Sequence, residues 1–185
     1  MRSLRLAILE HLHLLEITLC FGKLFSELKQ EHSDFASNLV VRTVGVVDYS
    51  VRESIKEFGL EENWEEIAYV PHVEVLNYQR RSKVLLVCIN NTLNATGILP
   101  GKFFEYLASG RPILAVGPTV SDIGRVLEIT KAGIIADTND LLAIKSAILS
   151  LYQNQSVEAS NSAIQKFSRK GLTKDLAALL DSILG

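Results

Sequence analysis

The stretch GILPGKFFEYLASGRPILAV, residues 97–116, decides the fold. A loop with two glycines opens it, an amphipathic helix follows, and Gly110-Arg111-Pro112 stops that helix in the usual way. The apolar run Ile113–Val116 is typical of a strand, and the earlier run Val84–Ile89 is apolar enough to be buried on both faces of a sheet. This succession of strand, loop, helix and strand predicts a βα unit of a parallel sheet.

The same alternation extends to both sides of this stretch. Upstream, the sequence predicts strands at Leu39–Val44 and Ile67–Val70, with helices at 50–58 and 72–81. Downstream, Ser121 is the expected N-cap of a helix, and Ile134 with Ile135 marks a last short strand. The fold class is therefore α/β, a Rossmann-like domain with a mostly parallel sheet and helices on both faces.

The two ends of the chain are less regular. A helix is expected to end near Tyr152, and residues 156–185 are expected to form C-terminal helices, with apolar side chains at helical spacing from Leu176 to Ile183. Met1–Phe21 fits a helix or a strand equally well, so its role stays open. The length of 185 residues suits a single domain.

Composition excludes several classes of protein. The chain is 48% apolar and 22% charged with a net charge of −2, so neither a nucleic-acid partner nor an acidic tail is indicated. Its two cysteines have no metal-ligand or disulfide-framework spacing, which favours a reducing cytoplasmic setting. Charged residues break the apolar N-terminus into runs too short for a transmembrane segment.

The helix within residues 97–116 has two unlike faces. The apolar face is expected to carry Phe103, Phe104, Leu107 and Ala108. The polar face is expected to carry Lys102, Glu105, Tyr106 and Ser109. Because ligands of open parallel sheets bind where strands end and helices begin, an ammonium and a carboxylate here could hold a phosphate and a ribose diol. A solvated face with an ion pair three residues apart explains the same pattern, so periodicity leaves both open.

The run GILPGKFFEYLASGRPILAVGP resembles the donor-binding motif of retaining GT-B glycosyltransferases of the group 1, family 4 type. The resemblance extends from about Leu39 to Tyr152, through the segments LVVRTVG, YVPH, VLLVCIN and KAGIIAD. It implies that the chain is the C-terminal, nucleotide-sugar-binding half of a GT-B fold. The implied substrate is a UDP-sugar or a GDP-sugar, and the implied chemistry needs no metal.

The resemblance also implies roles for particular residues. Glu105 would bind the ribose hydroxyls, and the turn of Tyr69, Val70 and His72 would line the base pocket. The diphosphate would face the loop and helix start, comprising Gly97, Ile98, Leu99, Pro100, Gly101 and Lys102. No catalytic residue is implied.

Two departures from the family pattern limit this reading. Gly97 stands where the family often has a glutamate that touches the transferred sugar, and Met1–Phe21 lacks the expected strand and glycine-rich turn. We expect the chain to bind the donor but to transfer nothing without an acceptor-binding domain, in an enzyme that is cytoplasmic or peripheral to a membrane. The alternatives are a non-catalytic binding or dimerising module, and a sugar-nucleotide epimerase-like domain.

The histidines and a basic cluster offer further candidates. His11 and His13 are two residues apart, on different faces of any helix, so no metal site is predicted. His72 could contact the nucleotide or cap the following helix, and capping is the favoured interpretation. Arg80, Arg81 and Lys83 are best explained as a charged helix end that complements the helix dipole.

Overall fold

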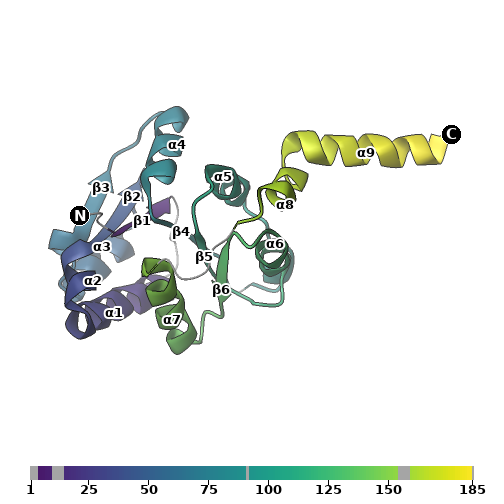
Figure 1. The fold of residues 1–185 in the computed structure, drawn as a ribbon. Helices are drawn as coiled ribbons and strands as arrows, with labels where there is room; N and C mark the ends of the chain where they lie inside the picture. Colours follow the sequence, from purple (N-terminus) through teal and green to yellow (C-terminus); the bar gives the residue numbers. More distant parts are fainter. Residues whose placement is uncertain (1–3, 10–14, 91, 154–158, 185) are drawn as a thin grey trace.

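A computed structural model describes residues 4–9, 15–90, 92–153 and 159–184. Six strands form one sheet in the order β3-β2-β1-β4-β5-β6, and all neighbouring strands run parallel (Figure 1). The strands are β1 (Leu4–Leu9), β2 (Leu39–Val44), β3 (Trp64–Ile67), β4 (Val84–Cys88), β5 (Ile113–Val116) and β6 (Gly133–Ala136). The predicted α/β class with a parallel sheet is confirmed.

Helices cover both faces of this sheet. The helices of the described residues are α1 (Leu15–Glu31), α2 (Ser33–Asn38), α3 (Tyr49–Glu57), α4 (His72–Arg81), α5 (Gly101–Ser109), α6 (Asp122–Thr130), α7 (Leu141–Tyr152), α8 (Asn161–Lys166) and α9 (Arg169–Leu184), of which α9 extends away from the sheet (Figure 1). Two short 3₁₀ helices, η1 (Glu61–Asn63) and η2 (Ala95–Gly97), lie in the connections before β3 and α5. Within the described ranges, no helix combines the length and the apolar content that crossing a membrane requires.

Side chains of the central strands alternate between two cores. Val84 and Leu86 point into the core under α1, α2, α3 and α7, whereas Leu85 and Val87 point into the core under α4, α5, α6 and α8. All four are at most 2% exposed. This is the double burial that the apolar run at 84–89 predicts.

The structure assigns part of the N-terminal segment, which the sequence leaves open. Met1–Phe21 fits a helix or a strand equally well by its sequence, and within it β1 lies inside the sheet and pairs with both β2 and β4. The run LRLAIL is short and interrupted by Arg5, and such a run does not distinguish a strand from a helix by periodicity. β1 is therefore identified as a strand by its pairing with β2 and β4, and its own sequence pattern would not have identified it.

The third strand lies elsewhere than predicted. The sequence favoured Ile67–Val70, but β3 covers Trp64–Ile67 and pairs with β2 from Val41 to Val44. Glu65 and Glu66 interrupt the apolar pattern of this edge strand, so the sequence does not reveal it. In the structure Glu65 accepts a hydrogen bond from Arg42, and Glu66 accepts one from Arg52. Strands at a sheet edge tolerate such charges because one edge faces solvent.

The faces of α5 are a second difference. Phe103 and Leu107 are buried as predicted, but Tyr106, expected on the polar face, is completely buried. Ala108, expected on the apolar face, is exposed. The buried side is centred on Phe103, Tyr106 and Leu107, at spacings of three and four, so that the covered stripe is rotated toward the tyrosine.

Candidate functional site

The start of α5 lies at the point where the strand order reverses. From β1 the chain adds strands in one direction to β3, and from β4 it adds them in the other direction to β6. The carboxyl ends of β1 and β4 are therefore neighbours whose following segments diverge, which is the position where open parallel sheets bind ligands. Residues Gly97–Lys102 lie between β4 and the body of α5, at the end of the connection that contains η2.

Two glycines at the start of α5 are not required by the fold. A Cβ atom added to Gly97 or Gly101 would meet no atom within 4 Å, and neither residue has a positive φ angle. The N-cap residue is Pro100, which makes no side-chain capping hydrogen bond within the described chain. The helix therefore begins with N–H groups open to the surroundings and with room for close approach to the backbone.

Glu105 projects from α5 toward α4, where two side chains hold its carboxylate. Glu105 Oε2 accepts from Gln79 Nε2 at 3.1 Å, and Glu105 Oε1 lies 3.0 Å from His72 Nε2. Gln79 is 1% exposed, whereas the His72 side chain is 66% exposed. One carboxylate oxygen thus has a buried, fixed donor and the other has an exposed partner that a ligand could replace.

His72 does not cap α4, in contrast to the favoured prediction. It is the first residue of α4, the N-cap is Pro71, and no side-chain capping bond forms there within the described residues. Proline at the N-cap directs the chain into the helix and places the imidazole of His72 beside α5. The same geometry explains its contact with Glu105.

The other two predicted base-pocket residues, Tyr69 and Val70, differ in how exposed their side chains are. Tyr69 lies in the connection between β3 and α4 and is 81% exposed. Val70 packs at the margin of the core beneath α4 and α5. Of the predicted turn residues, only His72 is brought into hydrogen-bond distance of Glu105.

Lys102 is close enough to the carboxyl end of β4 to influence its last residue. Desolvation by burial raises the pKa of the Cys88 thiol to about 12, and the positive charge of Lys102 acts in the opposite direction. Burial thus favours the neutral thiol form of Cys88 over the reactive thiolate. Lys102 brings a positive charge to the end of the sheet where the α5 amides begin.

Gln79 is a site residue that the sequence analysis did not identify. It occupies the buried face of α4 one turn after Val75, where an apolar side chain is expected. A polar residue at a core position is itself a signal, since a buried amide needs a partner. Its Nε2 atom donates to Glu105, while its Oε1 atom has no hydrogen-bond partner among the residues that the structure describes.

Metal ligands do not gather in the described part of the chain. Across residues 4–9, 15–90, 92–153 and 159–184, no group of three or more His, Cys, Asp or Glu side chains is placed to hold an ion. His11 and His13 lie outside the described residues. A ligand at α5 would consequently meet amides, Glu105 and Lys102 as the polar groups of this chain.

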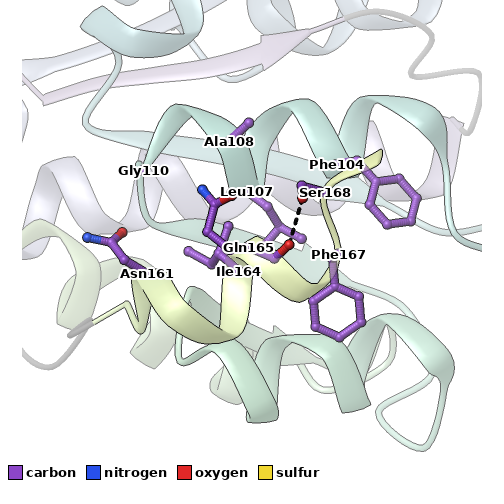
Figure 2. Close-up of a pocket in the computed structure, with 9 residues that line it drawn as sticks. All are labelled: Phe104, Leu107, Ala108, Gly110, Asn161, Ile164, Gln165, Phe167 and Ser168. Carbon is purple, nitrogen blue, oxygen red and sulfur yellow. Dashed lines mark hydrogen bonds between the residues drawn. The ribbon is translucent and has the colours of Figure 1, made fainter. Parts of the chain in front are cut away.

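A separate cavity lies between α5 and α8. Its volume is about 160 Å³, and Figure 2 shows Phe104 and Phe167 on one side of it and Asn161 at the other. The lining residues are Phe104, Leu107, Ala108, Gly110, Asn161, Ile164, Gln165, Phe167 and Ser168. None of them carries a charge, so this cavity does not suit an anionic ligand.

Comparison with solved structures shows the fold. Sucrose-phosphate synthase from Thermosynechococcus elongatus matches 98% of the chain with a TM-score of 0.72 at 12% identity, using 46% of its own length. The pneumococcal O-GlcNAc transferase GtfA, solved with UDP and GlcNAc, matches 99% of the chain with a TM-score of 0.68 at 16% identity, using 36% of its length. A UDP-N-acetylglucosamine 2-epimerase structure from Listeria monocytogenes matches 90% with a TM-score of 0.59 at 15% identity, using 43% of its length.

These likenesses confirm the predicted half of a GT-B, Rossmann-like fold. The chain spans less than half the length of the solved structures it matches. No protein-family model matches the sequence. No curated protein matches it either.

Proposed function

We propose that the chain is the donor-binding, C-terminal half of a retaining GT-B glycosyltransferase of the family 4 type, and that it binds a UDP-sugar or GDP-sugar at α5. One observation carries the proposal: the Glu105 carboxylate is oriented by buried Gln79 one turn from a helix start where neither glycine is needed by the fold. A nucleoside diphosphate needs those two features together, a carboxylate for the ribose diol and open amides for the phosphates.

The diphosphate is assigned to the segment from Gly97 to Lys102. Open N–H groups at the start of α5 and the positive end of its dipole favour an anion. Lys102 adds a positive charge on the first turn. The absence of a Cβ at Gly97 and Gly101 leaves space for phosphate oxygens against the backbone.

The ribose is assigned to Glu105 and the base to the turn before α4. A vicinal diol would donate to Glu105 Oε1 in place of His72, while Gln79 keeps Oε2 in position. Released from the carboxylate, His72 would lie beside Tyr69 and Val70 at the base. The exposure of Tyr69, 81%, leaves its ring available for stacking on a base.

Sugar transfer would follow from stabilisation of the departing diphosphate by the α5 amides and Lys102. Gly97 supplies no carboxylate to the transferred sugar, so sugar contacts would come from elsewhere. We expect the acceptor to bind a second domain, or a second subunit, that faces the carboxyl ends of β1 and β4. The proposal includes sugar transfer when that second domain or subunit is present, and a cytoplasmic setting for the enzyme.

Calorimetry with UDP and with GDP tests the proposed site. Glu105→Ala should weaken binding of the preferred nucleotide about 10- to 100-fold, because a charged hydrogen-bond acceptor is worth about 1.5–3 kcal/mol. Glu128→Ala, at an exposed position of the neighbouring α6, is the matched control and should bind like the parent chain. Binding of neither nucleotide, or equal binding by both variants, would contradict the proposal.

An epimerase-like role is the second candidate. The likeness to the UDP-N-acetylglucosamine 2-epimerase structure, which covers 90% of this chain, favours it over unrelated activities. Incubation with UDP-N-acetylglucosamine distinguishes the candidates: formation of its 2-epimer supports this role, and transfer or hydrolysis supports the transferase. Nucleotide binding without turnover by the chain alone is expected of both the donor-binding half and the non-catalytic binding module, and transfer or hydrolysis by the chain alone would rule out the non-catalytic module.

A further inference from the structure

The imidazole of His72 lies at the solvent-exposed side of the Glu105 carboxylate. Helices α4 and α5 pack side by side (Figure 1), and His72 Nε2 lies 3.0 Å from Glu105 Oε1 across this contact. An ionised carboxylate only accepts hydrogen bonds, so the imidazole donates to it through Nε2–H. The exposed oxygen of the carboxylate is therefore already occupied in the chain without a ligand.

The two partners of Glu105 differ in how firmly they are held. Gln79, which donates to Oε2, is buried on the face of α4 that packs on the core. The His72 side chain is largely exposed, and Glu105 is the one hydrogen-bond partner of its imidazole within the described part of the chain. Gln79 is thus a fixed support, whereas the imidazole can leave the carboxylate by breaking a single exposed hydrogen bond.

The position of His72 at the start of α4 allows its side chain to turn away. His72 is the first residue of the helix, after the N-cap Pro71. Because helical side chains point toward the helix start, a residue in the first turn has no earlier turn of its own helix to pack against. Rotation of the His72 side chain would therefore open the carboxylate without movement of the backbone.

We propose that His72 is an autoinhibitory latch on the ribose-binding carboxylate, closed in the chain without a ligand and displaced by a vicinal diol. The latch rests on the assignment of the ribose to Glu105 in the proposed function. A diol can reach the carboxylate only from the exposed side, since buried Gln79 closes the other side. The imidazole lies on that exposed side, so the closed latch and a bound ribose exclude each other.

The latch lowers the affinity for ligands that need the carboxylate and leaves the affinity for other ligands unchanged. When only a fraction of the molecules has an open site, the dissociation constant rises by the inverse of that fraction. Exposed pairs of the kind formed by His72 and Glu105 are weak, so the closed latch should cost a diol about two- to sixfold in affinity. A ligand without the diol can bind whether the latch is closed or open.

Nucleotides with and without the ribose hydroxyls isolate the latch from the rest of the site. The measured quantity is the ribose preference, which is the dissociation constant of a 2′,3′-dideoxynucleoside diphosphate divided by that of the matching UDP or GDP, from calorimetry. His72→Ala should raise this preference about two- to sixfold, because the diol no longer has to displace the imidazole. A contact of His72 with the base or the phosphates would affect both ligands and cancel in the ratio.

Two further variants separate the latch from the proposed function. Asn77→Ala, at an exposed position of the same helix, should leave the ribose preference unchanged, and Glu105→Ala should abolish it. If neither the unmodified chain nor His72→Ala prefers the ribonucleotide, the proposed function fails and the latch fails with it. If Glu105→Ala abolishes the preference but His72→Ala leaves it unchanged or lowers it, the proposed function stands and the latch is overturned.

Nitrogen NMR of the His72 imidazole tests the closed state without any nucleotide, with His72→Ala identifying the resonance. Glu105→Ala should shift the Nε2 resonance and Asn77→Ala should not, because only the first removes the hydrogen-bond acceptor. Saturation with UDP or GDP should shift this resonance in the same direction as Glu105→Ala does. A resonance that Glu105→Ala leaves in place would show that the latch is not closed and would overturn the proposal.

Discussion

Helices α5 and α9 are both amphipathic, but they meet opposite surroundings. The apolar side of α5 is closed by the sheet and by α4, with Phe103 and Tyr106 entirely buried. The apolar side of α9 faces away from the domain, with Leu176 more than half exposed. The same periodicity in sequence therefore predicts a helix with an apolar face, but not whether its own chain covers that face.

The polar sides of the two helices differ as well. On α5 the polar side carries Glu105, whose carboxylate is bonded by Gln79 and His72 from α4. On α9 the charges are divided along the length of the helix, with basic residues before Asp175 and acidic residues from there on. A carboxylate oriented by neighbouring side chains suits recognition of a small ligand, and the charges of α9 have no such partners in α4 or α5 among the hydrogen bonds of the described residues.

Truncation of a core residue gives the largest expected contrast between the helices. Phe103→Ala should lower the free energy of unfolding by about 3–5 kcal/mol, since the ring is completely buried. Leu176→Ala should change it by less than about 0.5 kcal/mol at concentrations where the chain is a single molecule. Urea unfolding of both variants measures this, and equal losses would show that α9 is packed on the domain.

Thiol reactivity distinguishes the same two regions chemically. Because desolvation raises the pKa of Cys88 to about 12, Cys88 should alkylate about a thousandfold more slowly at pH 8 than a cysteine introduced by Leu180→Cys. As pH rises from 8 to 10 the introduced thiol should approach its maximum rate, whereas the Cys88 rate should keep rising. Peptide mapping by mass spectrometry follows each site.

Equal rates in the native chain would contradict this prediction. Alkylation in concentrated urea is the control, since unfolding removes the desolvation of Cys88 and both thiols should then react alike. Cys20, whose pKa is also raised, chiefly by burial, serves as an internal reference within the same digest.

Alanine substitutions of the glycines at the two ends of α5 should differ in their effect on stability, and this difference is the smallest of the predicted effects. Gly110 ends the helix at a φ of 67°, so Gly110→Ala should lower stability by about 1 kcal/mol. Gly101→Ala should leave stability unchanged or raise it by about 0.5 kcal/mol, because its Cβ meets no atom. Thermal melting measures both, and a loss from Gly101→Ala would show that the fold itself requires that glycine.

The centre of the sheet could be predicted because β4 and β5 are uniformly apolar. The run at Val84–Cys88 and the helix at His72–Arg81 agree with the structure, and Ser121 Oγ accepts from Gly124 N as an N-cap should. The segment of β1 was left open between a helix and a strand, and β3 was displaced, because Arg5, Glu65 and Glu66 interrupt these strands. Charges within a strand are acceptable where neighbours pair them, and pairing is not visible in a single sequence.

The candidate site was predicted only in part. Glu105 and the glycines at 97 and 101 could be found because they follow one another along a loop and helix. The contacts of Glu105 with Gln79 and His72 could not, since those residues are 26 and 33 positions away and depend on how α4 lies against α5. Tyr106 was placed on the wrong face because the buried stripe of α5 is rotated by about one position.

The inner position of β1 has a consequence for how the molecule assembles. During synthesis residues 4–9 and 39–44 are made before residues 84–88, so β1 can pair with β2 before β4 exists. Until then the other side of β1 is an unprotected strand edge, the kind that invites pairing with foreign chains. Pairing with β4 covers that edge of β1, and only then can β5 and β6 extend the sheet on the other side.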